Sequence, residues 1–428
     1  MRDYGLLGLF FISIPFMIAR PFVGILIWSM FSYMNPHRLM YGIAYSFNFV
    51  MISATVTLIG IIFTKESKKV TFNGLAYVWL AFVVWVSFTT IFAYNEVGAM
   101  PEWIRMMKTQ ILILLTLMIV SSKERVNLLI WVIALSIGFY GIKGGFFTII
   151  TGGSFRVWGP IGSFIEGNNE LALALIMILP LMHYLHITQE NKKIKIALIV
   201  SMGLVSASII ASYSRGAFLA GGVMFIVMWL KSNKKFLSGS IMVVMVLAVL
   251  AFMPAEWFDR MGTIQEYDED RSALGRINAW HFAFNIALDR PIIGGGFNAF
   301  TPELFLQFAP DPEDYHDAHS IYFEVLGEHG FVGLMIFLLM GIMVMYTGRW
   351  IQKRTKNIEE LSWAKHLSEM LQVSFIGYAV GGAFLGLAYY DLPYHIMSIM
   401  IITHALVKKE LLVLDKPDNH QRSQRMMR

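Results

Sequence analysis

Residues 236–253, FLSGSIMVVMVLAVLAFM, form a run of eighteen residues without a single charge. Apolar residues follow one another along the run and do not alternate with polar ones, so the pattern does not indicate a half-buried strand. A run of this length and composition is typical of a helix that crosses a lipid bilayer. The chain around it is 56% hydrophobic over 428 residues, and similar runs recur along it. The sequence therefore predicts an all-α, polytopic integral membrane protein, because continuous apolar segments satisfy their backbone hydrogen bonds in lipid only as helices.

About twelve transmembrane helices are expected, in a single membrane domain that comprises residues 1–428. The first run, 5–34, is interrupted by Arg20 and Pro21 and is counted as one span, although two shorter helices are an alternative. The predicted spans lie near 5–34, 43–63, 72–92, 104–121, 126–149, 169–187, 194–211, 215–230, 236–253, 319–347, 367–389 and 394–407.

Loop charges predict the orientation of these spans. The net charge is +5, and the basic residues gather in short loops that fall on one face. This distribution is a topology signal and not a nucleic-acid footprint, so that face is expected to be cytoplasmic. Both termini are predicted on it, including a basic tail at 410–428. The loops concerned are TKESKK (64–69), SSKERVN (121–127), NKKIK (191–195), KSNKK (231–235) and GRWIQKRTK (348–356).

The opposite face receives the longest loop, residues 254–318, which is expected to be periplasmic and partly helical. It carries about twelve carboxylates against four arginines. An amphipathic helix is predicted over 272–288. The next segment, RPIIGGGFNAF at 290–300, contains three consecutive glycines, which allow a tight turn or a close backbone approach.

Arginines on this face are unexpected under the positive-inside bias and need an explanation. Arg215 lies in SYSRG, a turn of a few residues between two spans, which holds its guanidinium at the bilayer edge. Guanidinium groups bind phosphate oxygens in a bidentate manner, so Arg215 is a candidate for binding a lipid diphosphate. Arg156, among the glycines of GGSFRVWGP, is a second candidate. Snorkelling to headgroups or pairing with an acidic residue is the alternative for both.

The stretch DAHSIYFEVLGEHGFV at 317–332 contributes two kinds of ionisable residue. His319 is expected at the outer end of an unbroken helix over 319–347 and is a candidate general base, because histidine titrates near working pH. His316 competes for that role. Glu328 lies nine residues further on, too far for a hydrogen-bonded pair with His319, and is predicted to be a buried structural support. No fixed metal-binding motif is present, so no metal and no cofactor is expected.

With these motifs in view, the chain resembles the O-antigen ligase and polymerase superfamily of bacterial inner membranes. SRGAFLA at 214–220, RPIIGGGFNAF, and HSIYFEVLGEHGFVGL at 319–334 carry the resemblance. Two further segments resemble O-glycosylation ligases of exosortase-associated systems: RPFVGILIWSMFSYMNPHR at 20–38 and GPIGSFIEGNNELALALIMILPL at 159–181.

The resemblance implies that a glycan is transferred from undecaprenyl diphosphate to an acceptor hydroxyl at the periplasmic face, with inversion and without metal. His319 would match the essential histidine of the family, Arg215 its arginine after a span pair, and Arg276 an arginine of its large loop. Ser320 stands where many ligases have asparagine. Asp391, in YYDLP on the same face, is expected to orient His319 or to receive the acceptor.

The acceptor stays open at this stage: a lipid A-core sugar in a ligase, another lipid-linked glycan in a polymerase, or a protein hydroxyl in an O-linked oligosaccharyltransferase. A flippase or transporter of lipid-linked glycans is the alternative from another class. The clustering of ionisable residues near one face, and not at the midplane, argues against it. The expected partners are the lipid-linked donor, the acceptor and membrane lipid, with no nucleic acid.

Overall fold

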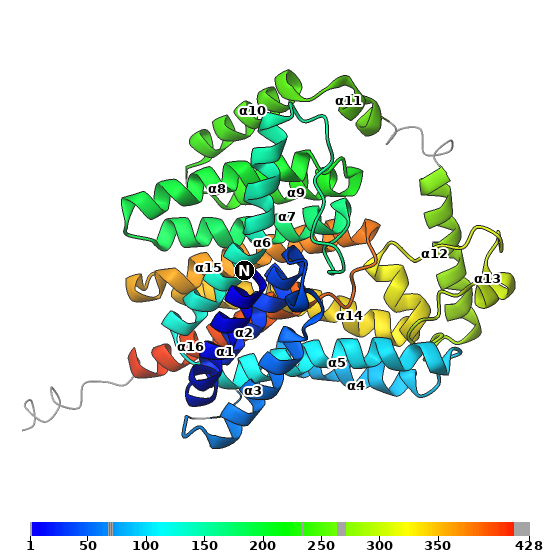
Figure 1. The fold of residues 1–428 in the computed structure, drawn as a ribbon, viewed down its shortest axis with the longest axis horizontal. Coiled ribbons are helices and arrows are strands. Elements are labelled where there is room, and N and C mark those ends of the chain that lie inside the picture. The colour runs from blue at the N-terminus through cyan, green and yellow to red at the C-terminus, as the bar shows by residue number, and fades with distance from the viewer. Residues whose placement is uncertain are drawn as a thin grey trace, which may run out of the picture.

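The computed structural model of the chain describes residues 2–66, 68, 70, 72–232, 234–262 and 271–414, without the side chains of Arg271 and Ser272. Within these residues every regular element is helical, which confirms the all-α part of the predicted fold class. The helices pack into one bundle, with α12 and α13 at one end (Figure 1). The predicted tail at 410–428 lies outside the described residues beyond Leu414.

Thirteen helices of the described residues correspond to the predicted apolar runs. They are α1 (Arg2–Ala19), α2 (Pro21–Met34), α3 (Phe49–Phe63), α4 (Gly74–Thr90), α5 (Glu96–Ile119), α6 (Lys123–Ile150), α7 (Asn168–Thr188), α8 (Lys192–Ile210), α9 (Arg215–Lys231), α10 (Lys235–Phe252), α14 (Ile321–Thr355), α15 (Ser362–Gly381) and α16 (Asp391–Leu414). Six of them, α1, α6, α7, α8, α10 and α14, are long and apolar enough to cross a membrane by length and composition.

The large loop is partly helical, as predicted, with α11 (Ala255–Gly262), α12 (Arg271–Asp289) and α13 (Pro302–Phe308). It has a small core of its own, in which Phe282 of α12 stacks on Phe305 of α13 with ring centroids 4.1 Å apart. Short 3₁₀ turns are η1 (Pro36–Leu39), η2 (Ile43–Ser46), η3 (Glu359–Leu361) and η4 (Gly382–Phe384).

The first predicted span forms two helices that run in opposite directions. Gly24, early in α2, packs on Thr57, late in α3, so α2 and α3 are antiparallel. Asp3, at the start of α1, accepts a hydrogen bond from the backbone N–H of Gly42, just ahead of α3. Gly60, late in α3, packs on the carbonyl end of α1. Therefore α1 runs parallel to α3 and antiparallel to α2.

This pair of helices corrects two predictions. The proline ring of Pro21 lacks an N–H and clashes with the preceding turn, so α1 ends at Ala19 and Pro21 begins a new helix. Counting 5–34 as one span was therefore wrong. For the same reason the predicted apolar runs correspond to thirteen helices and not to twelve, and the placement of both termini on one face depended on that count.

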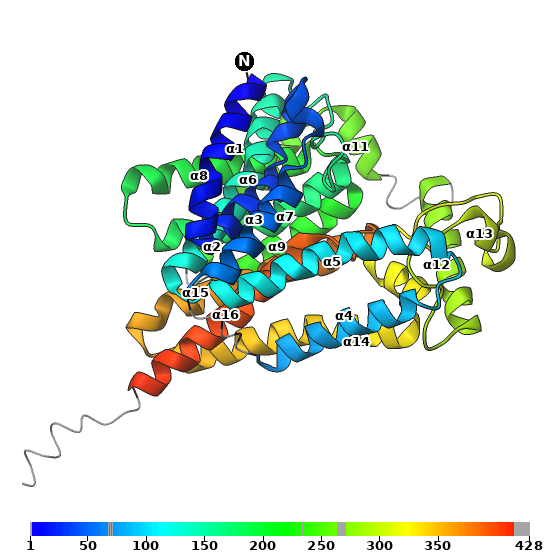
Figure 2. The ribbon, with the colours of Figure 1, turned by 60° about the horizontal axis from the view of Figure 1, so that its bottom comes forward.

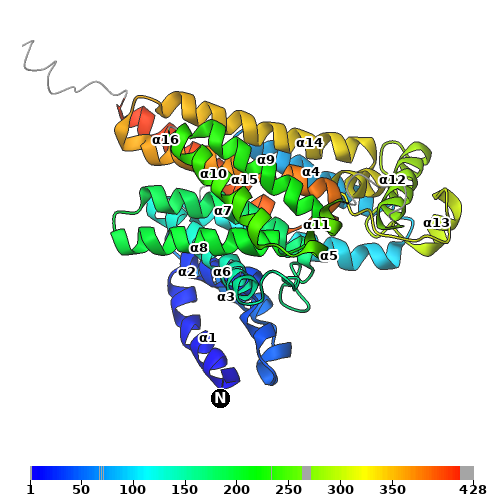
Figure 3. The ribbon, with the colours of Figure 1, turned by 90° about the horizontal axis from the view of Figure 1, so that it is seen from above.

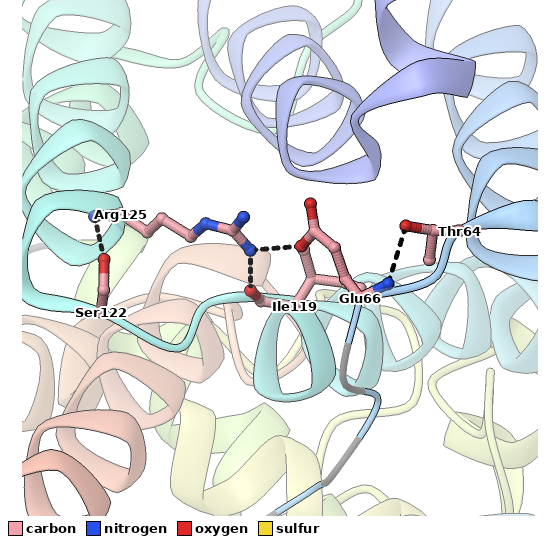
Figure 4. Close-up of polar contacts among 5 residues, drawn as sticks. All are labelled: Thr64, Glu66, Ile119, Ser122 and Arg125. Atoms are coloured by element: carbon pink, nitrogen blue, oxygen red, sulfur yellow. Dashed lines mark hydrogen bonds and ion pairs between the residues drawn. The ribbon is translucent and has the colours of Figure 1, made fainter.

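Several predicted cytoplasmic loops meet at one end of the bundle, which we call the basic end. Arg125, at the start of α6, binds the carboxylate of Glu66 after α3 (2.7 Å) and the carbonyl of Ile119 at the end of α5 (2.7 Å) (Figure 4). Lys123 lies over the ring of Trp363 at the start of α15, 5.7 Å from its centroid. These contacts agree with the shared face that the loop charges predicted.

A break at Gly330 interrupts α14, so the predicted unbroken helix over 319–347 was wrong. Gly330 has φ 68° and ψ −173°, a backbone conformation that residues other than glycine rarely adopt. Residues 290–300, which we call the glycine segment, lie against the break. Gly295 N–H donates to the carbonyl of Gly327 (2.8 Å) and Gly296 N–H to that of Glu328 (2.7 Å). Phe331 N–H in turn donates to Pro291 O (2.9 Å).

This insertion explains why glycines face each other here. A Cβ at Gly294 would lie 2.5 Å from the backbone nitrogen of Gly330, and one at Gly330 would lie 2.5 Å from the carbonyl oxygen of Ile292. No room for a side chain exists on either side. Elsewhere, Gly327 packs on Ala283 of α12, so the two helices approach each other closely there.

The core of the bundle surrounds α7, and α10 lies at its margin. In the most apolar stretch of α7, 78% of the residues are buried, against none in α10. Figure 2 shows α4 alongside α14, with α12 next to the beginning of α14.

Replacing Gly330 with alanine is expected to destabilise the protein. The backbone conformation of Gly330 is almost confined to glycine and costs about 1–3 kcal/mol for another residue, and the clash with the Ile292 carbonyl adds to it. The unfolding temperature of purified protein in detergent should fall. Gly341→Ala in the same helix is the control, because its Cβ would make an ordinary 3.4 Å contact with the Phe375 ring. Equal melting of the two variants would contradict the tight fit at the break.

Candidate active site

The beginning of α14 is fastened to α12 on either side of His319. Trp280 of α12 donates its indole N–H to the carbonyl of Ala318 (2.9 Å). The same indole stacks on Phe323, with ring centroids 5.0 Å apart and an interplanar angle of 8°. His319 lies between these two anchors, in the segment that precedes the helix, with a left-handed backbone (φ 43°). Its side chain is therefore held at the junction of α12 and α14.

Arg276 lies next to His319. It precedes Trp280 by four residues and so shares its face of α12. Burial is the main cause that lowers the pKa of His319, and the positive charge of Arg276 is the second. Asp317 acts in the opposite direction. The structure thus brings together two residues that are 43 positions apart in the sequence.

Arg276 also interacts electrostatically with Glu170, in the first turn of α7. The Glu170 side chain folds back over that turn: its carboxylate lies only 1.9 Å from the place that a Cβ at Gly167 would occupy. Glu170 was not among the predicted site residues. The signal that could have found it is a carboxylate at the start of an otherwise apolar run.

Arg215 is the first residue of α9, whose start is capped by Ser214 accepting the N–H of Ala217 (3.2 Å). The next residue, Gly216, packs on Phe384, 3.1 Å from where its Cβ would be. Gly386 follows Phe384 by two residues, and a Cβ at Gly386 would lie 3.7 Å from the backbone nitrogen of His319. Residues 382–388 therefore connect the start of α9 to the start of α14.

Arg156 is exposed on the other side of this turn. Its guanidinium lies over the ring of Tyr213, 5.8 Å from the centroid, two residues before Arg215. Tyr213 has φ 57° and donates its hydroxyl hydrogen to the carbonyl of Gly153 (2.8 Å). Arg156 is thus tied to the Arg215 turn through Tyr213.

Both oxygens of the Glu328 carboxylate are engaged by neighbouring segments. Oε1 accepts the backbone N–H of Asn298 (2.9 Å) and Oε2 the hydroxyl of Tyr389 (2.6 Å). Glu324, one turn earlier, accepts the N–H of Ala388 (3.0 Å). These hydrogen bonds join α14 to the glycine segment and to the segment before α16.

The two remaining predicted residues have other neighbours. Asp391 is buried at the start of α16, where its charge acts on Tyr33 of α2 and on Tyr390. His316, the competitor of His319, pairs with Asp314 (2.9 Å) and packs against Gly275. No contact of the described residues joins Asp391 to His319.

Two family models match parts of the chain. Residues 172–338 match a family model described as O-Antigen ligase. This match supports the O-antigen ligase superfamily for the chain. The matched O-antigen ligase segment runs from α7 into α14 and includes Arg215, Arg276, His319 and Glu328, whereas Arg156 and Asp391 lie outside it. A second model, of a family of unknown function, matches residues 1–190. No curated protein matches the chain.

The contacts of Glu328 generate a test of its structural role. Glu328→Ala removes both acceptors and leaves the N–H of Asn298 and the hydroxyl of Tyr389 without their partner, at about 1–3 kcal/mol for each. Glu328→Gln keeps one acceptor and can donate to the tyrosine oxygen. We expect a large fall in unfolding temperature for alanine and a small one for glutamine. Equal stability of the alanine variant and the wild type would refute the bracing role.

Proposed function

We propose that the protein transfers a glycan from undecaprenyl diphosphate to an acceptor hydroxyl. The observation that carries this proposal is the proximity of Arg276 and His319, at the end of the bundle opposite to the basic end and inside the O-antigen ligase segment. Members of this family are glycosyltransferase-like ligases and polymerases, which supports an enzyme. For the acceptor we favour a lipid A-core sugar.

In the proposed reaction, His319 takes the proton of the acceptor hydroxyl while the oxygen attacks the anomeric carbon. A new carbon–oxygen bond forms on one side of this carbon, and the bond to the diphosphate breaks on the other, so the configuration inverts. The diphosphate leaves with its electron pair. Arg276, Arg215 and Arg156 are proposed to neutralise the charge that develops on it, which lowers the barrier more than it stabilises the bound donor.

The surroundings of His319 suit this role. A general base must be neutral to accept a proton, and burial together with Arg276 lowers the pKa of His319 below its ordinary value of about 6.5. The lowered pKa therefore favours the neutral imidazole. No nucleotide is needed, because the donor already carries an activated diphosphate.

Asp391 has a different place in the proposal from the one first expected. Its neighbours are Tyr33 and Tyr390, so we no longer assign to it the orientation of His319. The proposal keeps the second role expected for Asp391, which is contact with the acceptor. A polymerase that elongates lipid-linked glycans would use the same donor chemistry, and an assay with lipid-linked donor as the only substrate separates the two, because only a polymerase lengthens the chains.

The proposal also includes a topology. We propose that α1–α10 and α14–α16 all cross the bacterial inner membrane, with the basic end in the cytoplasm and His319 on the periplasmic side. The count is thirteen and not twelve because α1 and α2 are separate helices. The N-terminus would then be periplasmic and the C-terminal tail cytoplasmic.

Removing the base is expected to abolish transfer without disturbing the fold. His319→Asn is the suitable variant, because asparagine tolerates the left-handed backbone but does not accept a proton at neutral pH. The turnover number should fall by about 10²–10⁴-fold with protein levels matched. His316→Asn, on the residue paired with Asp314, should retain activity. Wild-type turnover in His319→Asn would exclude the general-base role.

The pH profile offers a second test. Activity should be lost as the pH falls through the pKa of His319, since the protonated ring no longer accepts a proton. Arg276→Gln removes the second cause of the lowered pKa, so the acidic limb of kcat/KM should move to higher pH. Arg105→Gln, on an exposed arginine paired with Glu102, should leave the limb in place. An unchanged limb in Arg276→Gln would show that another group titrates.

A further inference from the structure

A long apolar groove lies between α10 and the rest of the bundle, away from the site described above. Its volume is about 890 Å³, and its walls come from α6, α7, α8, α9, α10 and α15. Methionine, isoleucine, leucine and phenylalanine make up half of the lining residues. Figure 3 shows α10 next to α9, and Figure 1 shows α10 at the upper edge of the bundle. Hydrocarbon chains of lipid are the natural filling of such a groove in a membrane.

One end of the groove is polar, and this is the basic end of the bundle. Two lysines, three histidines and one carboxylate gather there: Lys231, Lys234, His183, His186, His366 and Glu369. His366 lies 3.5 Å from the carboxylate of Glu369, and the rings of His183 and His186 have centroids 6.3 Å apart. The polar end thus holds two permanent positive charges against one negative charge.

Lys231 is partly buried at this end, where its ammonium donates to the side-chain oxygen of Gln372 (3.0 Å). The same oxygen accepts from Gln352 (2.9 Å), and the amide of Gln372 donates to the carbonyl of Met345 (2.7 Å). An ammonium has three N–H donors, so one glutamine oxygen does not exhaust it. The network fixes Lys231 at the mouth of the groove.

We propose that this groove binds one anionic phospholipid from the leaflet at the basic end. Its acyl chains lie along α8 and α10, and its phosphate binds Lys231 and Lys234. Hydrocarbon alone would not distinguish among lipids, but basic pockets between membrane helices on this side select anionic headgroups. This site is separate from the proposed glycan transfer and does not depend on it.

The groove is longer than one leaflet, because its lining on α10 extends from Leu237 to Phe252, over which a helix rises about 22 Å. From Lys192, at the start of α8, to Gly203, which lines the groove, a helix rises about 16 Å, which is close to half of the roughly 30 Å hydrocarbon core. Gly203 faces open space, since a Cβ there would meet no atom within 4 Å. The acyl chains would therefore end near Gly203.

Selection of the headgroup is tested with purified protein in detergent. Phosphatidylglycerol or phosphatidylcholine with identical acyl chains is added, and binding is measured by native mass spectrometry and by the change in unfolding temperature. The wild type should prefer phosphatidylglycerol. Replacing Lys231 and Lys234 with glutamine should reduce that preference by roughly tenfold to thirtyfold. This is the effect expected when the attraction of two lysines for an anionic lipid is lost. Lys192→Gln with Lys193→Gln is the matched control, on residues of the same end that do not line the groove.

The acyl chains are tested separately, which covers the case in which the lysine variant does not fold. Gly203→Trp places an indole in the groove, inclined toward the basic end because helical side chains tilt toward the N-terminus. It should abolish the preference for phosphatidylglycerol. Gly222→Trp on α9 is the control, because Gly222 also faces open space but does not line the groove.

Three results would overturn the proposal. Equal binding of both lipids by the wild type would mean that ordinary bilayer lipid fills the groove. Stabilisation by inorganic phosphate alone, undiminished in Gly203→Trp, would identify a site for a free anion. An unchanged lipid preference in both the lysine and the Gly203→Trp variants would place the lipid elsewhere on the protein.

Discussion

The hydrogen bonds between the glycine segment and the break in α14 hold the elements of the candidate site in register. Because the segment follows α12 directly, the anchoring of Gly295 and Gly296 on the carbonyls of Gly327 and Glu328 fixes how α12 lies on α14. The carboxylate of Glu328 extends the same junction to Tyr389. The segment around Tyr389 reaches the start of α9 through the Phe384 side chain, so α9, α12 and α14 meet through one small set of contacts.

Much of the fold could be predicted from the sequence, because apolar length is a property of each segment by itself. Half of the predicted spans coincide with helices to within about three residues at both ends, and the amphipathic helix of the large loop is present as α12. The two errors concern backbone geometry. Pro21 permits either a kink or a reversal, and only packing on α3 decides between them. Gly330 is equally compatible with a continuous helix until a second segment occupies its space.

The candidate site could be predicted only in part. Local sequence and resemblance identified His319, Arg215 and Arg276 as residues of interest, but their proximity depends on tertiary contacts such as that of Trp280 with Ala318. Nothing in the sequence around Asp391 indicated that its neighbour would be Tyr33, on a helix more than 350 positions away. Residue types indicate which chemistry is possible, whereas the distances between residues depend on helix packing, which a short motif does not determine.

The central position of α7 has a consequence for how the chain is divided. The two family matches, 1–190 and 172–338, overlap over most of this helix. A cut between them would pass through the most buried segment of the bundle and expose apolar surface on both pieces. Neither matched segment is then an autonomous module that could be expressed or exchanged by itself, and the two have to be inherited together around the helix that they share.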